Sequence, residues 1–151
     1  MTVRFGHVNL TAEDWRRLAA FYVEVFGCEP AGPERDLGGE ALASTVGLDA
    51  VRITGRHLRL PGHGPEGPTL EIFRYDPFEA RPPSVPNRPG FGHIAFQVDD
   101  VDATLERVLA AGGSRLGRPE TFEIPGAGVV RLVYCRDPEG NIVELQRWGD
   151  G

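Results

Sequence analysis

Phe5-Gly6-His7-Val8 recurs along the chain as Phe91-Gly92-His93-Ile94, at an offset of 86 residues (position 7 to position 93). A second pair of matching stretches follows, because Leu-Glu-Ile-Phe-Arg-Tyr at 70–75 corresponds to Val-Glu-Leu-Gln-Arg-Trp at 143–148. Two matches in the same order indicate a duplicated structural unit. The sequence therefore predicts that the chain consists of two copies of one module.

Each copy is predicted to be a βαβββ module with an amphipathic helix after its opening strand. In the first copy, apolar residues recur at helical spacing over 15–26, after a capping box at 11–14 and before a stop at Gly27. In the second copy, Asp99 or Asp100 can cap a helix that ends at a Gly-Gly pair. Further strands are expected at residues 29–31, 51–60 and 69–75, and again at 114–116, 128–135 and 141–148.

The two modules, residues 1–75 and 91–151, are separated by a segment rich in proline at 76–90. Its five prolines favour a stiff, extended linker over a helix or a strand. In the second module, Asp137-Pro138-Glu139-Gly140-Asn141 has the composition of a tight turn and is placed to fold the last two strands together. The predicted fold class is α+β, with two tandem βαβββ modules forming one domain.

Composition excludes several kinds of chemistry. All 16 Lys+Arg positions are arginine, so a Schiff-base lysine, a P-loop lysine and a Ser-Lys dyad are impossible. The net charge of −6 argues against nucleic acid or a membrane surface as the main partner. Two cysteines are too few for a disulfide framework, and the N-terminal residues lack the pattern of a secretory leader. We therefore expect a cytoplasmic protein with reduced thiols.

Histidine and glutamate occupy matching strand positions in the two copies. Because side chains alternate between the faces of a strand, His7 shares a face with Phe5 and Asn9, and the aliphatic residues beside each glutamate point the other way. Two imidazoles and two carboxylates suit one divalent ion such as Zn, Ni, Co, Mn or Fe, whose charge the carboxylates neutralise. The candidate metal ligands are His7, Glu71, His93 and Glu144.

Other polar residues are not expected to contribute to this site. His57 and His63 have no duplicate in the other copy, so neither is predicted to be a ligand. Arg74 and Arg147 are duplicated but face away from the glutamates, which favours helix-side ion pairs or exposed strand edges. Residues 34–44 belong to the longer first copy and are interpreted as either a mobile lid or a plain surface loop.

The paired modules, the two Phe-Gly-His openings, the Asp-Pro-Glu-Gly-Asn turn and the closing Ile-Val-Glu-Leu strand resemble the vicinal oxygen chelate superfamily over nearly the whole chain. That superfamily includes glyoxalase I, methylmalonyl-CoA epimerase, extradiol dioxygenases, fosfomycin-resistance enzymes and metal-free bleomycin-binding proteins. The resemblance implies a cupped mixed sheet that holds one divalent metal ion. It also implies a homodimer, the common assembly of these proteins.

The four ligand positions of glyoxalase I fall on the four candidate ligands. The resemblance implies a metal-dependent isomerase, lyase or epimerase in which the metal chelates neighbouring oxygens of a small-molecule substrate, while Glu144 or Glu71 moves a proton. Thr11 and Tyr75 differ from the residues usual at these positions in bacterial glyoxalase I, which argues against glutathione as the thiol. Substrate contacts are expected from Phe5, Asn9, Phe73, Tyr75, Gln97 and Trp148.

Two other functions remain open at this point. An Fe(II) extradiol-type dioxygenase needs two histidines and one carboxylate, and a fourth protein ligand such as Glu71 would close a position that its substrates use. A metal-free protein that binds a small molecule, such as an antibiotic, predicts that no stoichiometric divalent ion accompanies the purified chain. Metal analysis therefore separates the binding protein from both enzymes.

Overall fold

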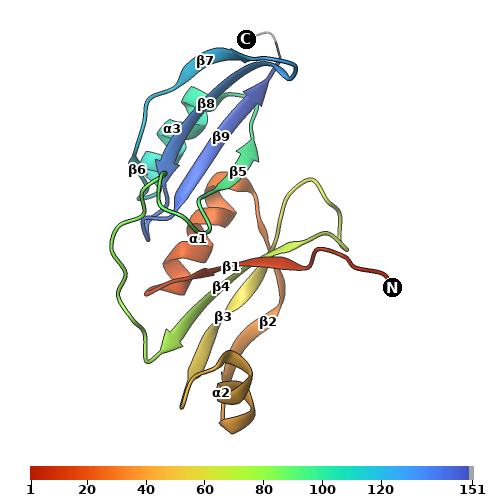
Figure 1. The fold of residues 1–151 in the computed structure, drawn as a ribbon, viewed down its shortest axis with the longest axis vertical. Helices are drawn as coiled ribbons and strands as arrows, with labels where there is room; N and C mark the ends of the chain where they lie inside the picture. The colour runs from red at the N-terminus through yellow and green to blue at the C-terminus, as the bar shows by residue number, and fades with distance from the viewer. Residues whose placement is uncertain (150–151) are drawn as a thin grey trace. The chain divides into compact units, whose positions relative to one another are not determined.

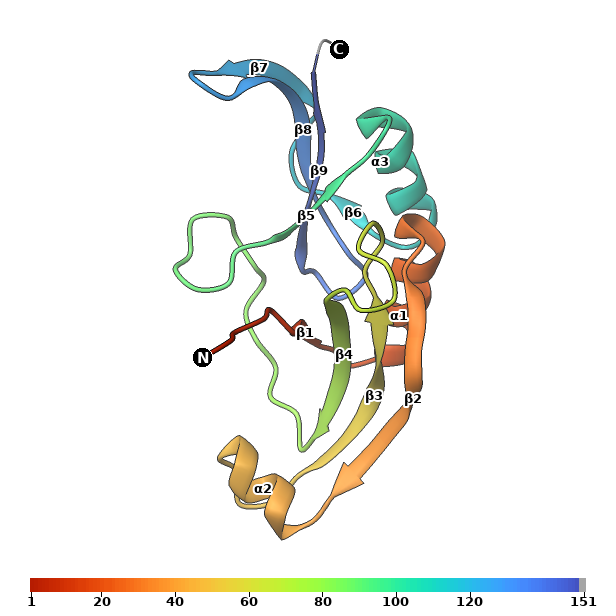
Figure 2. The same ribbon diagram turned by 90° about the vertical axis from the view of Figure 1, so that its right-hand side faces the viewer.

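The computed structural model describes residues 1–149, which form two compact units (Figure 1, Figure 2). The first unit comprises residues 1–81, and the second begins at Pro82. Residues 77–93, which the structure describes throughout, contain neither a helix nor a strand. Each unit contains one mixed sheet with a helix packed on it, which confirms the predicted α+β class. No helix among the described residues is long and apolar enough to span a membrane.

The first unit has a four-stranded sheet with strand order β1-β4-β3-β2. Strand β1 runs parallel to β4, and the other neighbours are antiparallel. This is the predicted βαβββ order with one additional helix, α2, between β2 and β3. The elements are β1 (His7–Thr11), α1 (Trp15–Phe26), β2 (Glu29–Gly38), α2 (Glu40–Val46), β3 (Arg52–Arg59) and β4 (Thr69–Asp76).

The second unit repeats this arrangement with strand order β5-β9-β8-β6. Strand β5 runs parallel to β9, as β1 does to β4. An additional strand, β7, pairs with β8 and was not predicted, because it is short and almost wholly exposed and so lacks an apolar alternation. The elements are β5 (Ile94–Gln97), α3 (Val101–Ala110), β6 (Ser114–Arg115), β7 (Glu120–Ile124), β8 (Gly128–Arg136) and β9 (Ile142–Trp148).

Helix α1 lies where the sequence predicts it, but it begins differently. The carboxylate of Asp14 accepts a hydrogen bond from the backbone N–H of Arg17, so Asp14 is the N-cap. The prediction that Thr11 starts a capping box is wrong, because Thr11 pairs with Phe73 as the last residue of β1. At the other end Gly27 adopts a left-handed conformation, and its N–H bonds to the carbonyl of Val23, as expected for a C-terminal stop.

Helix α1 buries one face of the first sheet, and the other face carries Glu71 beside an apolar cluster that packs under α2. Leu58, Leu70 and Ile72 are fully buried on the strands against which α1 packs. On the same face Arg74 donates to the carbonyl of Glu13 at 2.7 Å and pairs with Asp76, which agrees with the predicted helix-side role. Because alternate residues point to opposite faces, Glu71 faces away from α1.

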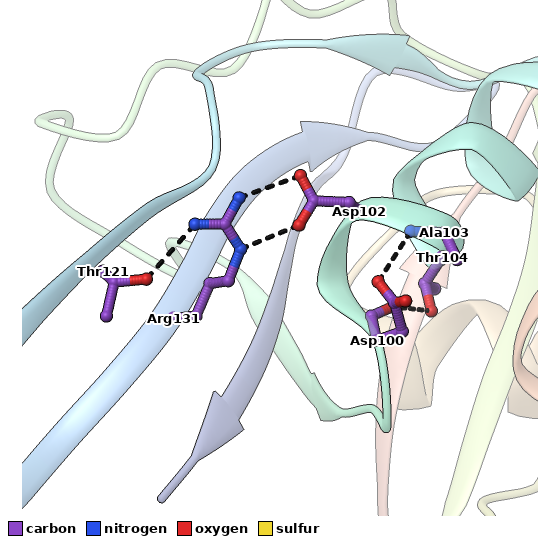
Figure 3. A network of polar contacts seen from close by, with 6 residues as sticks. All are labelled: Asp100, Asp102, Ala103, Thr104, Thr121 and Arg131. Carbon is purple, nitrogen blue, oxygen red and sulfur yellow. Dashed lines mark hydrogen bonds and ion pairs between the residues drawn. The ribbon is translucent and has the colours of Figure 1, made fainter. Parts of the chain in front are cut away.

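Helix α3 is joined to its sheet by a polar network (Figure 3). Asp100 caps the helix, accepting from the N–H of Ala103 at 2.9 Å, which confirms one of the two predicted caps. The guanidinium of Arg131 on β8 donates two hydrogen bonds to Asp102, at 2.8 and 2.9 Å, and a third to Thr121 on β7. The pair holds the pKa of Asp102 below its ordinary value, chiefly through these hydrogen bonds. One arginine therefore links α3, β8 and β7.

Residues 34–44 form regular structure and are not a loop. They complete strand β2 and begin helix α2, which lies at the end of β2 and β3 in both views (Figure 1, Figure 2). Ala43 of α2 belongs to a buried cluster with Val51, Ile53 and Phe73. This helix was not predicted, since seven residues are too few for a clear periodicity.

Gly55 on β3 occupies a position that only glycine can fill. Its φ is +154°, and a Cβ atom there would meet the carbonyl oxygen of Ile72 and would lie 2.6 Å from Cδ1 of Phe73. We expect Gly55→Ala to lower the free energy of unfolding by about 3 kcal/mol, from overpacking and backbone strain together. Urea denaturation measures this, with Gly38→Ala as the control, because a Cβ at Gly38 makes only an ordinary contact. Equal stability of the two variants would contradict the prediction.

Both cysteines are buried free thiols, as predicted. Burial raises the pKa of Cys28 and of Cys135 to about 12. These thiols are therefore neutral at physiological pH and belong to the cores of their units.

Candidate metal centre

In the first unit, Glu71 lies at the centre of a cluster of side chains that could bind a metal ion. Its Oε2 is 3.6 Å from Nε2 of His7 and 2.9 Å from Nε2 of His57. One ligand atom from each of the three residues lies within 4.8 Å of the others. The Glu71 and His57 side chains are 14% and 19% exposed, whereas His7 is 48% exposed, so the cluster opens to solvent on the His7 side.

Sheet register brings these side chains together. Strand β4 pairs Glu71 with Asn9 on one side and with His57 on the other. Asn9 donates from Nδ2 to Oε1 of Glu71 at 2.9 Å, so each carboxylate oxygen has its own partner. Nδ1 of His57 is 2.8 Å from the hydroxyl of Thr69, which fixes the ring with Nε2 toward the carboxylate. The structure thus places two predicted ligands, His7 and Glu71, side by side.

His57 was expected to lie outside the site, yet it contacts Glu71. The predicted strands 51–60 and 69–75 correctly indicate a hairpin, but they leave its register open. A shift of one residue would turn His57 to the opposite face of the sheet. The observed pairing of Arg59 with Thr69 sets the register that places His57 opposite Glu71.

The surroundings of His57 favour its neutral form. Burial lowers the pKa of His57, and electrostatic interactions with His7 and Arg35 lower it further, whereas the Glu71 carboxylate acts in the opposite direction. A neutral imidazole keeps one nitrogen lone pair, which is the form that binds a metal.

In the second unit, the equivalent pair is His93 and Glu144. Nε2 of His93, just before β5, is 2.9 Å from Oε2 of Glu144 on β9. Tyr134 pairs with Glu144 across β8 and β9, and its ring centroid lies 4.7 Å from that of His93. Burial, the Glu144 charge and a hydrogen bond to Glu144 raise the pKa of Tyr134, so the phenol stays protonated. Tyr134 therefore occupies the place that His57 has in the first unit.

The predicted substrate residues of the first unit lie in three different environments. Asn9 is hydrogen-bonded to Glu71, whereas Phe5 precedes β1 and is 67% exposed. Phe73 is buried in the cluster under α2, with Tyr75 packed against it, so these two rings contribute to the core of the unit. Burial raises the pKa of Tyr75, and the negative charge of Glu71 raises it further.

The second unit combines polar residues with a cavity on the face that carries Glu144. Gln97 pairs with Gln146 between β5 and β9, and Trp148 donates from Nε1 to Oε1 of Gln146 at 2.6 Å. A cavity of about 430 Å³ adjoins Tyr134 and is mostly apolar. Its walls include Leu116, Arg118, Glu120, Phe122, Leu132 and Tyr134.

Two βαβββ modules that each carry a His–Glu pair define a duplicated α+β fold. The chain belongs to the Glyoxalase/Bleomycin resistance protein/Dioxygenase superfamily, whose sequence profile matches residues 4–145. It is 35% identical to a 2-epi-5-epi-valiolone epimerase from an Actinomyces species, in a match covering 95% of this chain and 78% of that protein. It is 30% identical to a lactoylglutathione lyase of Arabidopsis thaliana, covering 97% of this chain and 44% of that protein.

Solved structures agree with this assignment of the fold. A glyoxalase family protein from Bacillus cereus superimposes with a TM-score of 0.80 at 22% identity, covering 99% of this chain and 97% of that one. The fosfomycin resistance protein FosX of Listeria monocytogenes, in complex with Mn(II) and sulfate, gives a TM-score of 0.54 at 19% identity, covering 99% and 95%. Both likenesses concern the fold alone.

Proposed function

We propose that the chain is a divalent-metal-dependent enzyme that moves a proton next to a carbonyl group of a small substrate, as an epimerase or a glyoxalase-like isomerase or lyase. The observation that carries the proposal is the repeated His–Glu contact, at 3.6 Å in the first unit and 2.9 Å in the second. Two donors bound to one ion at about 2.0–2.2 Å lie about 3 Å apart when adjacent, so both pairs fit a common ligand geometry.

The residues divide into ligands, bases and residues that orient them. His7, Glu71, His93 and Glu144 would hold the ion, which supplies Lewis acidity to the substrate oxygens when bound. Glu144 and Glu71 are the proposed bases, because a carboxylate near the reacting carbon can accept a proton and return it. Asn9 orients Glu71, and the protonated phenol of Tyr134 orients Glu144.

Among proton transfers, epimerisation is the version that we favour. The relative named as an epimerase matches over most of its own length, whereas the lyase match covers less than half of that protein. A carboxylate base in each module also suits epimerisation, in which one group removes a proton and another delivers it to the opposite face. The mostly apolar cavity beside Tyr134 is proposed to receive part of the substrate.

Metal analysis with reconstitution tests this function. Purified protein is expected to contain about one divalent ion per chain, and a chelator should reduce turnover by at least about 100-fold until an ion is restored. Activity is screened on cyclic ketoses, acyl-CoA epimers, hemithioacetals and catechols, with proton exchange followed by NMR in D₂O. Absence of a stoichiometric ion would favour a metal-free binding protein over an enzyme. Fe-dependent ring cleavage of a catechol would instead identify a dioxygenase.

A further inference from the structure

His57 has no role in the proposed reaction, although it is the histidine held most firmly beside Glu71. Its Nε2 lies closer to the carboxylate than that of His7, at 2.9 Å against 3.6 Å, and its side chain is much less exposed. The equivalent position in the second unit is Tyr134, which offers no nitrogen donor. The two units therefore differ in the number of side chains that can bind a metal.

The geometry around His57 is that of a prepared ligand. Histidines that bind metals usually have their second ring nitrogen fixed by a hydrogen bond, which sets the orientation of the ring. The Thr69 hydroxyl makes this contact with Nδ1 at 2.8 Å and leaves Nε2 facing Glu71. The rings of His7 and His57 meet edge to face with their centroids 5.4 Å apart, so both reach the same carboxylate from different directions.

We propose that His57 is a third metal ligand of the first unit, which with His7 and Glu71 forms a site able to bind a divalent transition metal without His93 and Glu144. This inference rests on the proposed function for the presence of a metal and adds a ligand to it. Within the part of the chain that the structure describes, no second cluster of three such donors is found.

Cobalt(II) is the probe, because its visible absorption and its paramagnetically shifted imidazole proton signals report ligand type as well as affinity. The full chain is prepared with His93→Ala and Glu144→Ala together, which removes the second pair. This double variant is expected to retain one Co(II) per chain. Adding His57→Phe should weaken Co(II) binding by more than about 100-fold, beyond the 10–100-fold typical of losing a hydrogen-bond partner of a ligand.

The control is His63→Phe in the same background, because His63 lies in an exposed loop of the same unit. His57→Gln is a second variant, whose amide can still donate to Glu71 but is a poor ligand; it should bind Co(II) as weakly as His57→Phe. In the otherwise unchanged chain, His57→Phe should also remove one shifted imidazole signal. Circular dichroism and thermal unfolding verify that each variant is folded.

The outcomes separate this inference from the proposed function. If the unchanged chain binds no Co(II), the proposed function fails. If it binds Co(II) and His57→Phe leaves the affinity and the imidazole signals unchanged, the inference alone is overturned. Weaker binding with the same number of imidazole signals, restored by His57→Gln, would also overturn it, because His57 would then only position Glu71.

Discussion

Glu144→Gln is expected to reduce turnover by at least about 100-fold while the variant remains folded, since general base catalysis by a positioned carboxylate typically contributes 10²–10⁴-fold. The amide keeps the size of the side chain but cannot accept a proton at the pH of the reaction. The measurement is kcat with saturating metal, together with the rate of deuterium incorporation at the reacting carbon. If Glu71 serves the opposite face of the substrate, Glu71→Gln should abolish exchange from that face.

The matched control for this prediction is Glu123→Gln, which makes the same chemical change at an exposed position on β7. It should leave kcat unchanged. Metal content must be measured in all three variants, because a lower kcat with an equal loss of metal would assign Glu144 to binding and not to proton transfer. Unchanged exchange and turnover in Glu144→Gln would exclude Glu144 as a base.

Asp137→Ala is expected to lower the free energy of unfolding by about 4 kcal/mol, the largest effect we predict on stability. Asp137 is 2% exposed, and its Oδ1 accepts from the backbone N–H groups of Glu139 and Asn141. Its Oδ2 accepts from Nδ2 of Asn141 at 2.7 Å. Hydrogen bonds to charged groups contribute about 1.5–3 kcal/mol each, and their removal leaves buried donors without partners. Urea denaturation followed by circular dichroism measures the change.

Two further variants define what Asp137 contributes. Asp137→Asn retains one acceptor oxygen and should lose about half as much stability, whereas Asp49→Ala, at an exposed position, should change stability by less than about 0.5 kcal/mol. Because this turn joins β8 to β9, a destabilised turn should also loosen the contact between Tyr134 and Glu144. Equal stability of Asp137→Ala and the unchanged chain would contradict the prediction.

The duplication made much of the fold predictable. The repeated His–Glu pattern can be read without knowledge of packing, and it located the strands that carry His7, Glu71 and Glu144 and the strand that follows His93. The turn from Asp137 to Asn141 was also predictable, because its residues specify the conformation locally. Helix α3 likewise starts at one of the two predicted caps. Local signals sufficed for these elements, but not for α2 or β7.

Features that depend on distant partners were not predictable. Threonine is common at the N-cap of helices, but pairing with β4 keeps Thr11 in β1. Asp14 caps the helix instead. His57 and Glu71 come together only through the register of a hairpin, which alternation of apolar residues does not determine to one residue. The proximity of His57 to the candidate site therefore needed the three-dimensional structure.

The cross-strand partner of each glutamate is a position at which the two units differ. Both units carry a histidine and a glutamate, but His57 lies opposite one carboxylate and Tyr134 opposite the other. A single codon at this position decides whether a half offers an imidazole or a phenol. Enzyme engineers could therefore adjust each half separately, without altering the four duplicated side chains or the strands that carry them.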